Sequence, residues 1–113
     1  MLVLETEVDL ATETSSQQFE GAEHGVDVSF FLTHMEPGRG PALHRHAYPE
    51  VFVIASGEAT FTVGEDSFVA RGGQTLVVPA GEWHAFKNTG SDLLEMTNIH
   101  PVAAMKTEWR SDG

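Results

Sequence analysis

Hydrophobic and polar residues alternate over short segments of this chain, with the two-residue period of β-strands rather than the 3.6-residue period of helices. In residues 26–35 the apolar side chains Val28, Phe30 and Leu32 share one face, and residues 59–64 alternate in the same way. Further strands are expected at residues 42–47, 50–56, 67–70, 75–78, 84–88 and 93–99, each bounded by Gly, Pro, Asn or Asp. Short strands at this spacing predict an all-β sandwich or a closed barrel.

Two of the expected strands are apolar on both faces. In residues 50–56 the even positions include Phe52 and Ile54, whereas the odd positions include Val51 and Val53, and residues 75–78 show a similar pattern. A strand that is buried on both sides needs two covering layers, and a domain of this size supplies only one. We therefore expect a homodimer with these strands in the interface. The alternative is that the N-terminal arm covers them within one chain.

The length and composition fit one domain. The chain has 113 residues, of which 41% are hydrophobic and 20% charged, which is the balance of an ordinary globular protein. We expect an acidic N-terminal arm (residues 1–25, with a loop around residues 15–18), a core barrel (26–100) and a C-terminal tail (101–113).

The charge and the absence of cysteine exclude several classes of function. Six lysines and arginines stand against 17 acidic residues, for a formal charge of −11, so the chain cannot build the basic face that nucleic acid requires, and an anionic membrane surface would not attract it. There is no cysteine, which rules out disulfides and thiolate ligands. The N-terminal residues lack the basic charge of a secretory signal. We expect a cytoplasmic protein whose partner is a small molecule.

His44 and His46 are the first candidates for metal binding. On a strand their side chains point to the same side, with Cα atoms about 7 Å apart, and two imidazoles at that separation can converge on one ion. Glu50 follows after Pro49, and His84 comes from a distant segment after a turn. An isolated His-x-His on a strand is more often structural than metal-binding, so the surrounding spacing decides the interpretation.

The two segments that contain these residues have a regular spacing of glycine, proline, histidine and glutamate. The first runs Gly38, five residues, His44, one, His46, three, Glu50, six, Gly57; the second runs Gly73, five residues, Pro79, one, Gly81, two, His84, three, Asn88. Both resemble the two signature motifs of the cupin superfamily, with every fixed position filled and residues 58–72 as a short spacer. The resemblance implies a cupin jelly-roll β-barrel with one metal near its centre, bound by His44, His46, Glu50 and His84.

The implied ligand set suits one divalent transition metal, namely Fe, Mn, Ni, Zn, Co or Cu. It would leave one or two coordination positions open for a substrate or dioxygen. Glu50 is also the candidate catalytic base, because a carboxylate that loosens from a metal can accept a proton. We expect an apolar pocket, although ordinary core positions are the alternative for the same residues. Its expected lining is Phe30, Phe52, Ile54, Phe61 and Met96.

Two further residues lie near the motifs without filling a fixed position. His100 ends the last expected strand and could reach the rim of the site, but a satisfied core histidine is the simpler interpretation. Tyr48, between His46 and Glu50, could place its hydroxyl near the site, but a surface loop position is simpler. Asn88 is expected to tie down a loop by hydrogen bonds rather than to bind metal.

Few cations can reach the predicted site. Arg45 and Lys87 alternate away from the ligand histidines, and only Arg39, in a glycine turn, could reach the mouth. A phosphorylated sugar or polycarboxylate normally needs basic clamps, so a neutral or mono-anionic organic molecule fits better. We expect a metal-dependent enzyme, with a dioxygenase as the first interpretation and a lyase or isomerase next. The alternative is a non-catalytic small-molecule-binding module, since fold does not decide chemistry.

Overall fold

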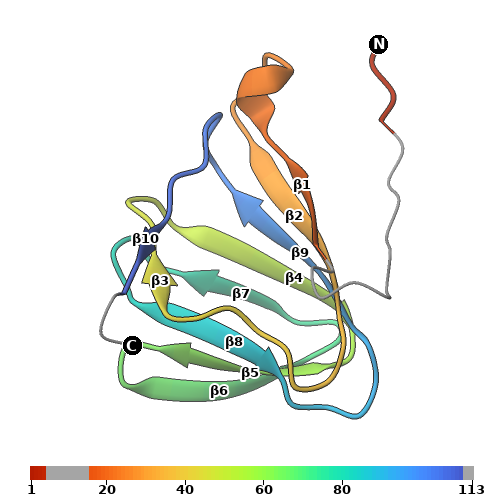
Figure 1. Ribbon diagram of the computed structural model, residues 1–113, viewed down its shortest axis with the longest axis vertical. Coiled ribbons are helices and arrows are strands. Elements are labelled where there is room, and N and C mark those ends of the chain that lie inside the picture. The colour runs from red at the N-terminus through yellow and green to blue at the C-terminus, as the bar shows by residue number, and fades with distance from the viewer. Residues whose placement is uncertain (5–15, 111–113) are drawn as a thin grey trace.

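The computed structural model describes residues 1–4 and 16–110, and its strands form two five-stranded sheets that face each other (Figure 1). The first sheet contains β1 (Ser16–Phe19), β2 (Ser29–Met35), β9 (Leu94–His100), β4 (Glu50–Ser56) and β7 (Thr75–Val78), in that spatial order. The second contains β10 (Glu108–Trp109), β3 (His44–Arg45), β8 (His84–Asn88), β5 (Glu58–Val63) and β6 (Asp66–Arg71), also in spatial order. The all-β two-sheet fold predicted from the sequence is confirmed.

Helical structure contributes little to the described part of the chain. A single 3₁₀ turn, η1 (Gly21–Glu23), lies in the connection between β1 and β2. Among the described residues, no helix combines the length and the apolar character that crossing a membrane would require. The architecture therefore depends on strand pairing, and all the pairings are antiparallel.

Segments on both sides of the expected core barrel also contribute strands. β1 pairs with β2 where a loop was expected around residues 15–18. β10 belongs to the expected tail and pairs with β3, with Trp109 opposite His44. Residues 5–15 of the expected arm lie outside the described residues. The pairing of β10 brings the C-terminal segment against the strand that carries the first predicted ligand.

The hydrophobic core lies between the sheets and consists of inward-facing side chains of β4, β5, β8 and β9, with Ala70 of β6 and Val78 of β7. Phe52 and Phe61 are fully buried, and their rings meet edge to face with centroids 4.9 Å apart. Because side chains two apart on a strand share a face, Phe52 anchors Glu50 on β4, and Phe86 anchors His84 on β8. Burial of each such side chain is worth about 1.5–3 kcal/mol, which fixes the strand ends that carry the site.

The inward face of β2 is the opposite of the one that its apolar pattern favoured. Ser29 and Thr33 are buried, and Phe31 is on the same inward face. Phe30 faces outward and stacks on Phe19 with ring centroids 4.8 Å apart, so the expectation that Phe30 lines the pocket is wrong. The reason is the register of β2 on β9, which places Phe31 opposite the inward-facing Asn98.

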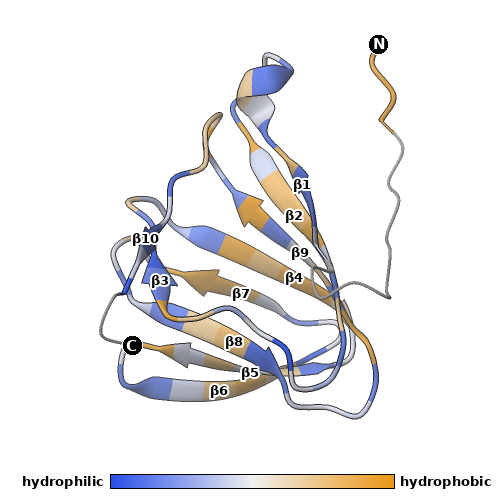
Figure 2. Ribbon diagram, viewed as in Figure 1, coloured by the Kyte–Doolittle hydropathy of each residue, from blue (hydrophilic) through white to orange (hydrophobic). Residues whose placement is uncertain are grey.

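The outward side of the first sheet is apolar, and Figure 2 colours most of β2 and β7 as hydrophobic. We call this surface the outer face; its large apolar members are Phe19, Phe30, Leu32, Val51, Val53, Val77 and Ile99. Val53 and Val77 keep 39% and 65% of their surface exposed. Leu2 and Leu4 share a surface hollow with Phe30 and Leu32. Residues 1–4 therefore flank one side of the outer face and leave the β4–β7 side uncovered.

Candidate metal centre

Four buried side chains that are separated in the sequence converge at one end of the space between the sheets. They are His44 on β3, His46 just after it, Glu50 at the start of β4 and His84 at the start of β8. One ligand atom from each lies within 4.8 Å of the corresponding atoms of the other three. The structure thus brings together the four side chains that the sequence analysis selected as metal ligands.

Strand pairing and one tight turn place the three imidazoles. His44 is paired directly with His84 across β3 and β8, and their ring centroids are 4.3 Å apart. His46 follows two residues after His44, with ring centroids 5.3 Å apart. The turn before His84 contains Gly81, whose φ of 81° favours glycine, and its amide donates to the His46 carbonyl at 2.8 Å. The turn is therefore tied to the segment that carries the other two imidazoles.

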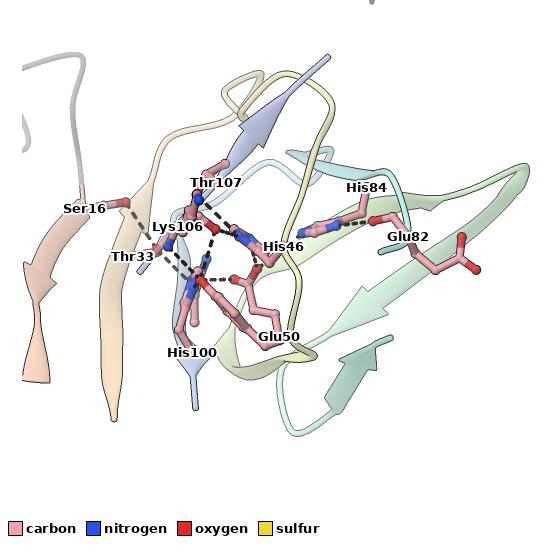
Figure 3. Close-up of polar contacts among 11 residues, drawn as sticks. Ser16, Thr33, His46, Glu50, Glu82, His84, His100, Lys106 and Thr107 are labelled. Atoms are coloured by element: carbon pink, nitrogen blue, oxygen red, sulfur yellow. Dashed lines mark hydrogen bonds and ion pairs between the residues drawn. The ribbon is translucent and has the colours of Figure 1, made fainter. Parts of the chain in front are cut away.

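Backbone carbonyls determine the tautomer of each of these three histidines. The Nδ1 atoms of His44, His46 and His84 lie 2.8, 3.0 and 2.9 Å from the carbonyl oxygens of Ala42, Lys106 and Glu82 (Figure 3 shows the last two contacts). A carbonyl can only accept, so each Nδ1 carries the proton and each neutral ring has its lone pair on Nε2. This is the arrangement in which metal-binding histidines are commonly held.

The Nε2 atoms then face a carboxylate oxygen rather than a donor. Glu50 Oε1 lies 2.9 Å from His46 Nε2 and 3.3 Å from His84 Nε2. Despite this closeness, His46 Nε2 is buried with no hydrogen-bond partner of acceptable geometry in the described part of the chain. Lone pairs that face one another in a buried site repel, and a cation between them removes the repulsion. The donor set and this orphaned nitrogen fit a divalent transition metal.

The protonation states of the site also favour a cation. Burial lowers the pKa of His44 to about 4. Burial is the largest single influence on His46 and lowers its pKa, but the Glu50 carboxylate and the Lys106 carbonyl together outweigh burial and raise it. For Glu50 burial raises the pKa, yet its close contacts with His100, His46 and His84 hold it well below its usual range. A neutral His44 and an ionised Glu50 are the forms that bind metal.

Two residues beyond the predicted ligand set also belong to this cluster. His100, at the end of β9, is 2% exposed, and its Nε2 lies 3.2 Å from Glu50 Oε2. The Tyr48 hydroxyl lies 2.7 Å from His100 Nδ1, so Tyr48 is not a plain surface loop residue. The alternation of side chains along β9 could have predicted the position of His100, because His100 lies on the same face as the buried Met96 and Asn98.

The cavity beside the cluster has a different lining from the expected one. Its volume is about 440 Å³, and His44, His46, Glu50 and His100 form part of its wall. Its apolar wall consists of Phe31, Met35, Pro41, Phe86 and Trp109. The expected wall residues Phe52, Ile54, Phe61 and Met96 instead belong to the buried core beneath it, which was the alternative interpretation. Among the described residues, Arg39 is the one lysine or arginine in the cavity wall.

Two other positions near the site can be compared with their expectations. Asn88 donates from Nδ2 to the carbonyls of Met35 and Asp92 at 2.8 and 2.9 Å, so it ties down a loop as predicted. Arg45 points away from the cluster, and its guanidinium lies 4.3 Å from the centre of the Trp83 ring. Neither side chain contributes to the candidate metal centre.

Comparisons with known sequences agree with this geometry. A family model described as the cupin domain matches residues 31–100. Auxin-binding protein 1 of Arabidopsis thaliana is 30% identical over 86 residues, which cover 67% of this chain and 43% of that protein. An uncharacterised protein of Streptomyces coelicolor is 31% identical over 75 residues, covering 66% of this chain and 71% of that one. The chain thus spans less than half the length of the Arabidopsis relative.

Solved structures share the fold. The manganese-containing oxalate decarboxylase of Bacillus subtilis superposes with a TM-score of 0.79 at 20% identity, over 91% of this chain and 30% of that chain. A recombinant oxalate oxidase in complex with glycolate superposes with a TM-score of 0.74 at 21% identity, over 84% of this chain and 54% of the other. At these identities the likeness concerns the fold alone.

Proposed function

The chain belongs to the cupin domain family, and on that premise we propose that it is a metal-dependent enzyme acting on a small neutral or mono-anionic organic molecule. The observation that carries the proposal is the buried set of His44, His46, Glu50 and His84 at the wall of a cavity of about 440 Å³. Three imidazoles and a carboxylate suit Mn, Fe, Co, Ni, Cu or Zn. The presence of Mn(II) centres in a structural neighbour supports this choice of ions.

The residues of the site have separable roles in this proposal. A divalent metal bound there would polarise a substrate oxygen as a Lewis acid. His44, His46 and His84 would hold it through Nε2, since their Nδ1 protons are committed to backbone carbonyls. Glu50 is first a ligand and second the candidate proton acceptor. It is a weak base as long as its histidine neighbours keep its pKa low.

The cavity lining supports a substrate of low charge. Phe31, Met35 and Phe86 supply apolar surface, and Arg39 is the sole lysine or arginine of the wall among the described residues. One guanidinium can pair with one carboxylate, whereas a phosphorylated sugar or polycarboxylate needs several such partners. The Arabidopsis relative is named for binding auxin, and the two structural neighbours are named for a small molecule of higher charge, oxalate. These names favour a small-molecule ligand over a macromolecule.

Within this class, a dioxygenase is our first choice of reaction, followed by a lyase or isomerase. Open coordination positions beside an apolar cavity suit an organic substrate together with dioxygen. The second candidate function is non-catalytic binding of a small molecule at the same centre. The observation that favours it is the likeness to a relative named as a binding protein.

We also propose that two copies associate through the outer face. The five strands of that sheet contribute no lysine, arginine or aspartate, and Glu95 is the one acidic residue that they place on the outer face. Two chains that each carry a formal charge of −11 repel one another, and an uncharged contact surface adds the least to that repulsion. The apolar, partly exposed side chains of β4 and β7 provide such a surface.

Metal analysis and oxygen consumption test the functional proposal. Protein purified without a histidine tag is expected to retain close to one equivalent of transition metal. After anaerobic reconstitution with Fe, Mn or Ni, oxygen uptake is expected with a member of a panel of catechols, flavonols and diketones. Absence of uptake with every metal, together with ligand-dependent thermal shifts, would favour the binding module. Failure to bind any of the metals would contradict the site itself.

A further inference from the structure

A histidine outside the predicted ligand set also contacts Glu50, but its hydrogen bonding is the reverse of that of the three predicted ligand histidines. His100 presents Nε2 to Glu50 Oε2 at 3.2 Å (Figure 3). Its Nδ1 meets the Tyr48 hydroxyl at 2.7 Å and not a carbonyl. His100 and Glu50 are both buried and Tyr48 is half-buried, so the ring nitrogens of His100 are satisfied by these two neighbours. The position of each proton can therefore be worked out from the surrounding groups.

The Tyr48 hydroxyl determines which nitrogen of His100 carries the proton. Its oxygen accepts the Lys106 N–H at 3.3 Å, so its own proton remains available to donate. Two acceptors are within reach, namely His100 Nδ1 at 2.7 Å and the Lys106 carbonyl at 3.5 Å. The shorter contact is the stronger hydrogen bond. His100 Nδ1 is then an acceptor, and the ring proton lies on Nε2.

The opposite tautomer is disfavoured by charge. It would turn a bare Nε2 lone pair toward the ionised Glu50 at 3.2 Å, in a site where His100 is 2% exposed. With the proton on Nε2, His100 instead donates a charge-assisted hydrogen bond to Oε2. This donation is the leading contribution among those that hold the pKa of Glu50 below its usual range against burial.

The two carboxylate oxygens of Glu50 consequently have different partners. Oε2 is committed to His100, whereas Oε1 faces His46 Nε2 and His84 Nε2 at 2.9 and 3.3 Å. Tyr48 also stacks on the His46 ring, with centroids 5.0 Å apart and planes 15° apart. One loop side chain thus contacts both a ligand histidine and the histidine that holds the ligand carboxylate.

We propose that Tyr48 and His100 are positioning residues that hold Glu50 with Oε1 alone directed to the metal, so that the carboxylate binds through one oxygen. His100 is therefore not a fifth ligand, since its Nε2 carries a proton and its Nδ1 accepts from Tyr48. The inference rests on the proposed metal site. Partners of this kind commonly change metal affinity by about 10–100-fold when they are removed.

The experiment is a Co²⁺ titration followed by visible absorption, which reports both the dissociation constant and the coordination geometry. His100→Leu removes the donor, Tyr48→Phe removes only the hydroxyl, and His100→Gln restores an N–H near the position of Nε2. His34→Leu is the matched control, because His34 pairs with Glu95 at 3.4 Å on the outer face, away from the cluster. Thermal unfolding of each metal-free variant separates loss of affinity from loss of folding.

The expected order of affinity distinguishes positioning from general stability. His100→Leu is expected to weaken Co²⁺ binding by about 10–100-fold and to alter the absorption bands, whereas His100→Gln stays within about fivefold of the wild type. Tyr48→Phe is expected to weaken binding less than His100→Leu. The double variant should be no weaker than His100→Leu alone, because Tyr48 acts through His100.

Two outcomes would overturn the inference, and they have different meanings. If the wild-type protein binds Co²⁺ but Tyr48→Phe and His100→Leu bind it within twofold and with unchanged bands, the positioning role is wrong and the metal site stands. If His100→Leu does not fold, unchanged binding and bands in Tyr48→Phe are sufficient for that conclusion. If the wild-type protein does not bind Co²⁺, the proposed metal site is wrong, and the inference is wrong with it.

Discussion

The two faces of the first sheet differ in where they carry polar side chains, because buried polar groups gather on the inner face beside the apolar core. The inner face, toward the second sheet, carries Ser29, Thr33, Asn98, Glu50 and His100, all nearly inaccessible to solvent. The outer face carries the valines, phenylalanines, leucine and isoleucine defined above, some of them well exposed. On β2 the fully buried positions are Ser29 and Thr33 while Phe30 and Leu32 face outward, which is opposite to the usual pattern of a sandwich, whereas β4 is apolar on both faces.

This distribution has an energetic cost on both sides of the sheet, and each cost points to a function. Burying polar groups is unfavourable unless each finds a partner, and the inner groups find theirs in long-range contacts such as Ser29 with the Val102 carbonyl at 2.8 Å. Leaving apolar groups in water is also unfavourable. The proposed binding site would account for the buried polar groups of the inner face, and the proposed dimer would account for the exposed apolar groups of the outer face.

The largest expected effect concerns neighbours on β4 that point to opposite faces. Phe52 is fully buried, so Phe52→Ala is expected to lower the free energy of unfolding by about 3–5 kcal/mol. Val53 is 39% exposed, and Val53→Ala should cost less than about 1 kcal/mol. Urea unfolding of the metal-free proteins measures both. Equal losses at the two positions would remove the energetic distinction between the faces.

The second prediction concerns the polar end of the inner face and its metal. His84→Ala is expected to weaken binding of Mn²⁺ or Co²⁺ by about 100-fold or more, because removing a ligand should exceed the effect of removing an outer partner. Inductively coupled plasma mass spectrometry and calorimetric titration measure the loss. His34→Ala, on the outer face, should leave the affinity unchanged. Full metal occupancy in His84→Ala would contradict the ligand assignment.

The parts of the structure that were predictable from the sequence are those governed by local periodicity. The two-residue alternation identified β4, β7 and β8 with their observed bounds. The same alternation placed His44 and His46 on one side of their strand, and the motif spacing linked them to Glu50 and His84. The motif spacing was therefore sufficient to predict that these four side chains meet, before the pairing of β3 with β8 was known.

The expectations that the structure changed depend on contacts that periodicity does not encode. Phe30 and Phe31 are adjacent, and the register of β2 on β9 decides that Phe31 faces inward. On that inward face of β2, the hydroxyls of Ser29 and Thr33 take the place of the usual apolar side chains. Tyr48 meets His100 across 52 positions of sequence. The polar strands β1 and β10 form on sheet edges, where neighbouring strands supply the hydrogen bonds. Residue periodicity alone therefore assigned the wrong face to the side chains of β2.

The third prediction tests the explanation for the apolar outer face. Val77→Glu adds charge to a 65% exposed position, and it is expected to weaken self-association by about tenfold or more, because an unpaired charge would be buried between two acidic chains. Val69→Glu is the matched control, since Val69 is 42% exposed on the other sheet. Sedimentation velocity over a concentration series measures both variants. A wild-type monomer at micromolar concentration would overturn the proposed dimer.

The smallest expected effect concerns one hydroxyl on the inner face. Thr33 donates to Asn98 Oδ1 at 3.2 Å, and since its proton is used there, the Ser16 hydroxyl donates to the Thr33 oxygen at 3.2 Å. Thr33→Val keeps the shape and removes both bonds, so it is expected to cost about 1 kcal/mol. Thr97→Val, on the outer face, should change stability by less than about 0.5 kcal/mol.

Urea unfolding of this pair of threonine variants tests whether hydrogen bonds hold the polar side chains of the inner face in fixed positions. Asn98 lines the cavity, so a side chain held by Thr33 would present a fixed amide to a ligand, whereas an unheld one would turn freely. If Thr33→Val costs no more than Thr97→Val, the two faces differ in composition but not in order. If it costs about 1 kcal/mol more, the inner face is organised for binding even at positions distant from the metal ligands.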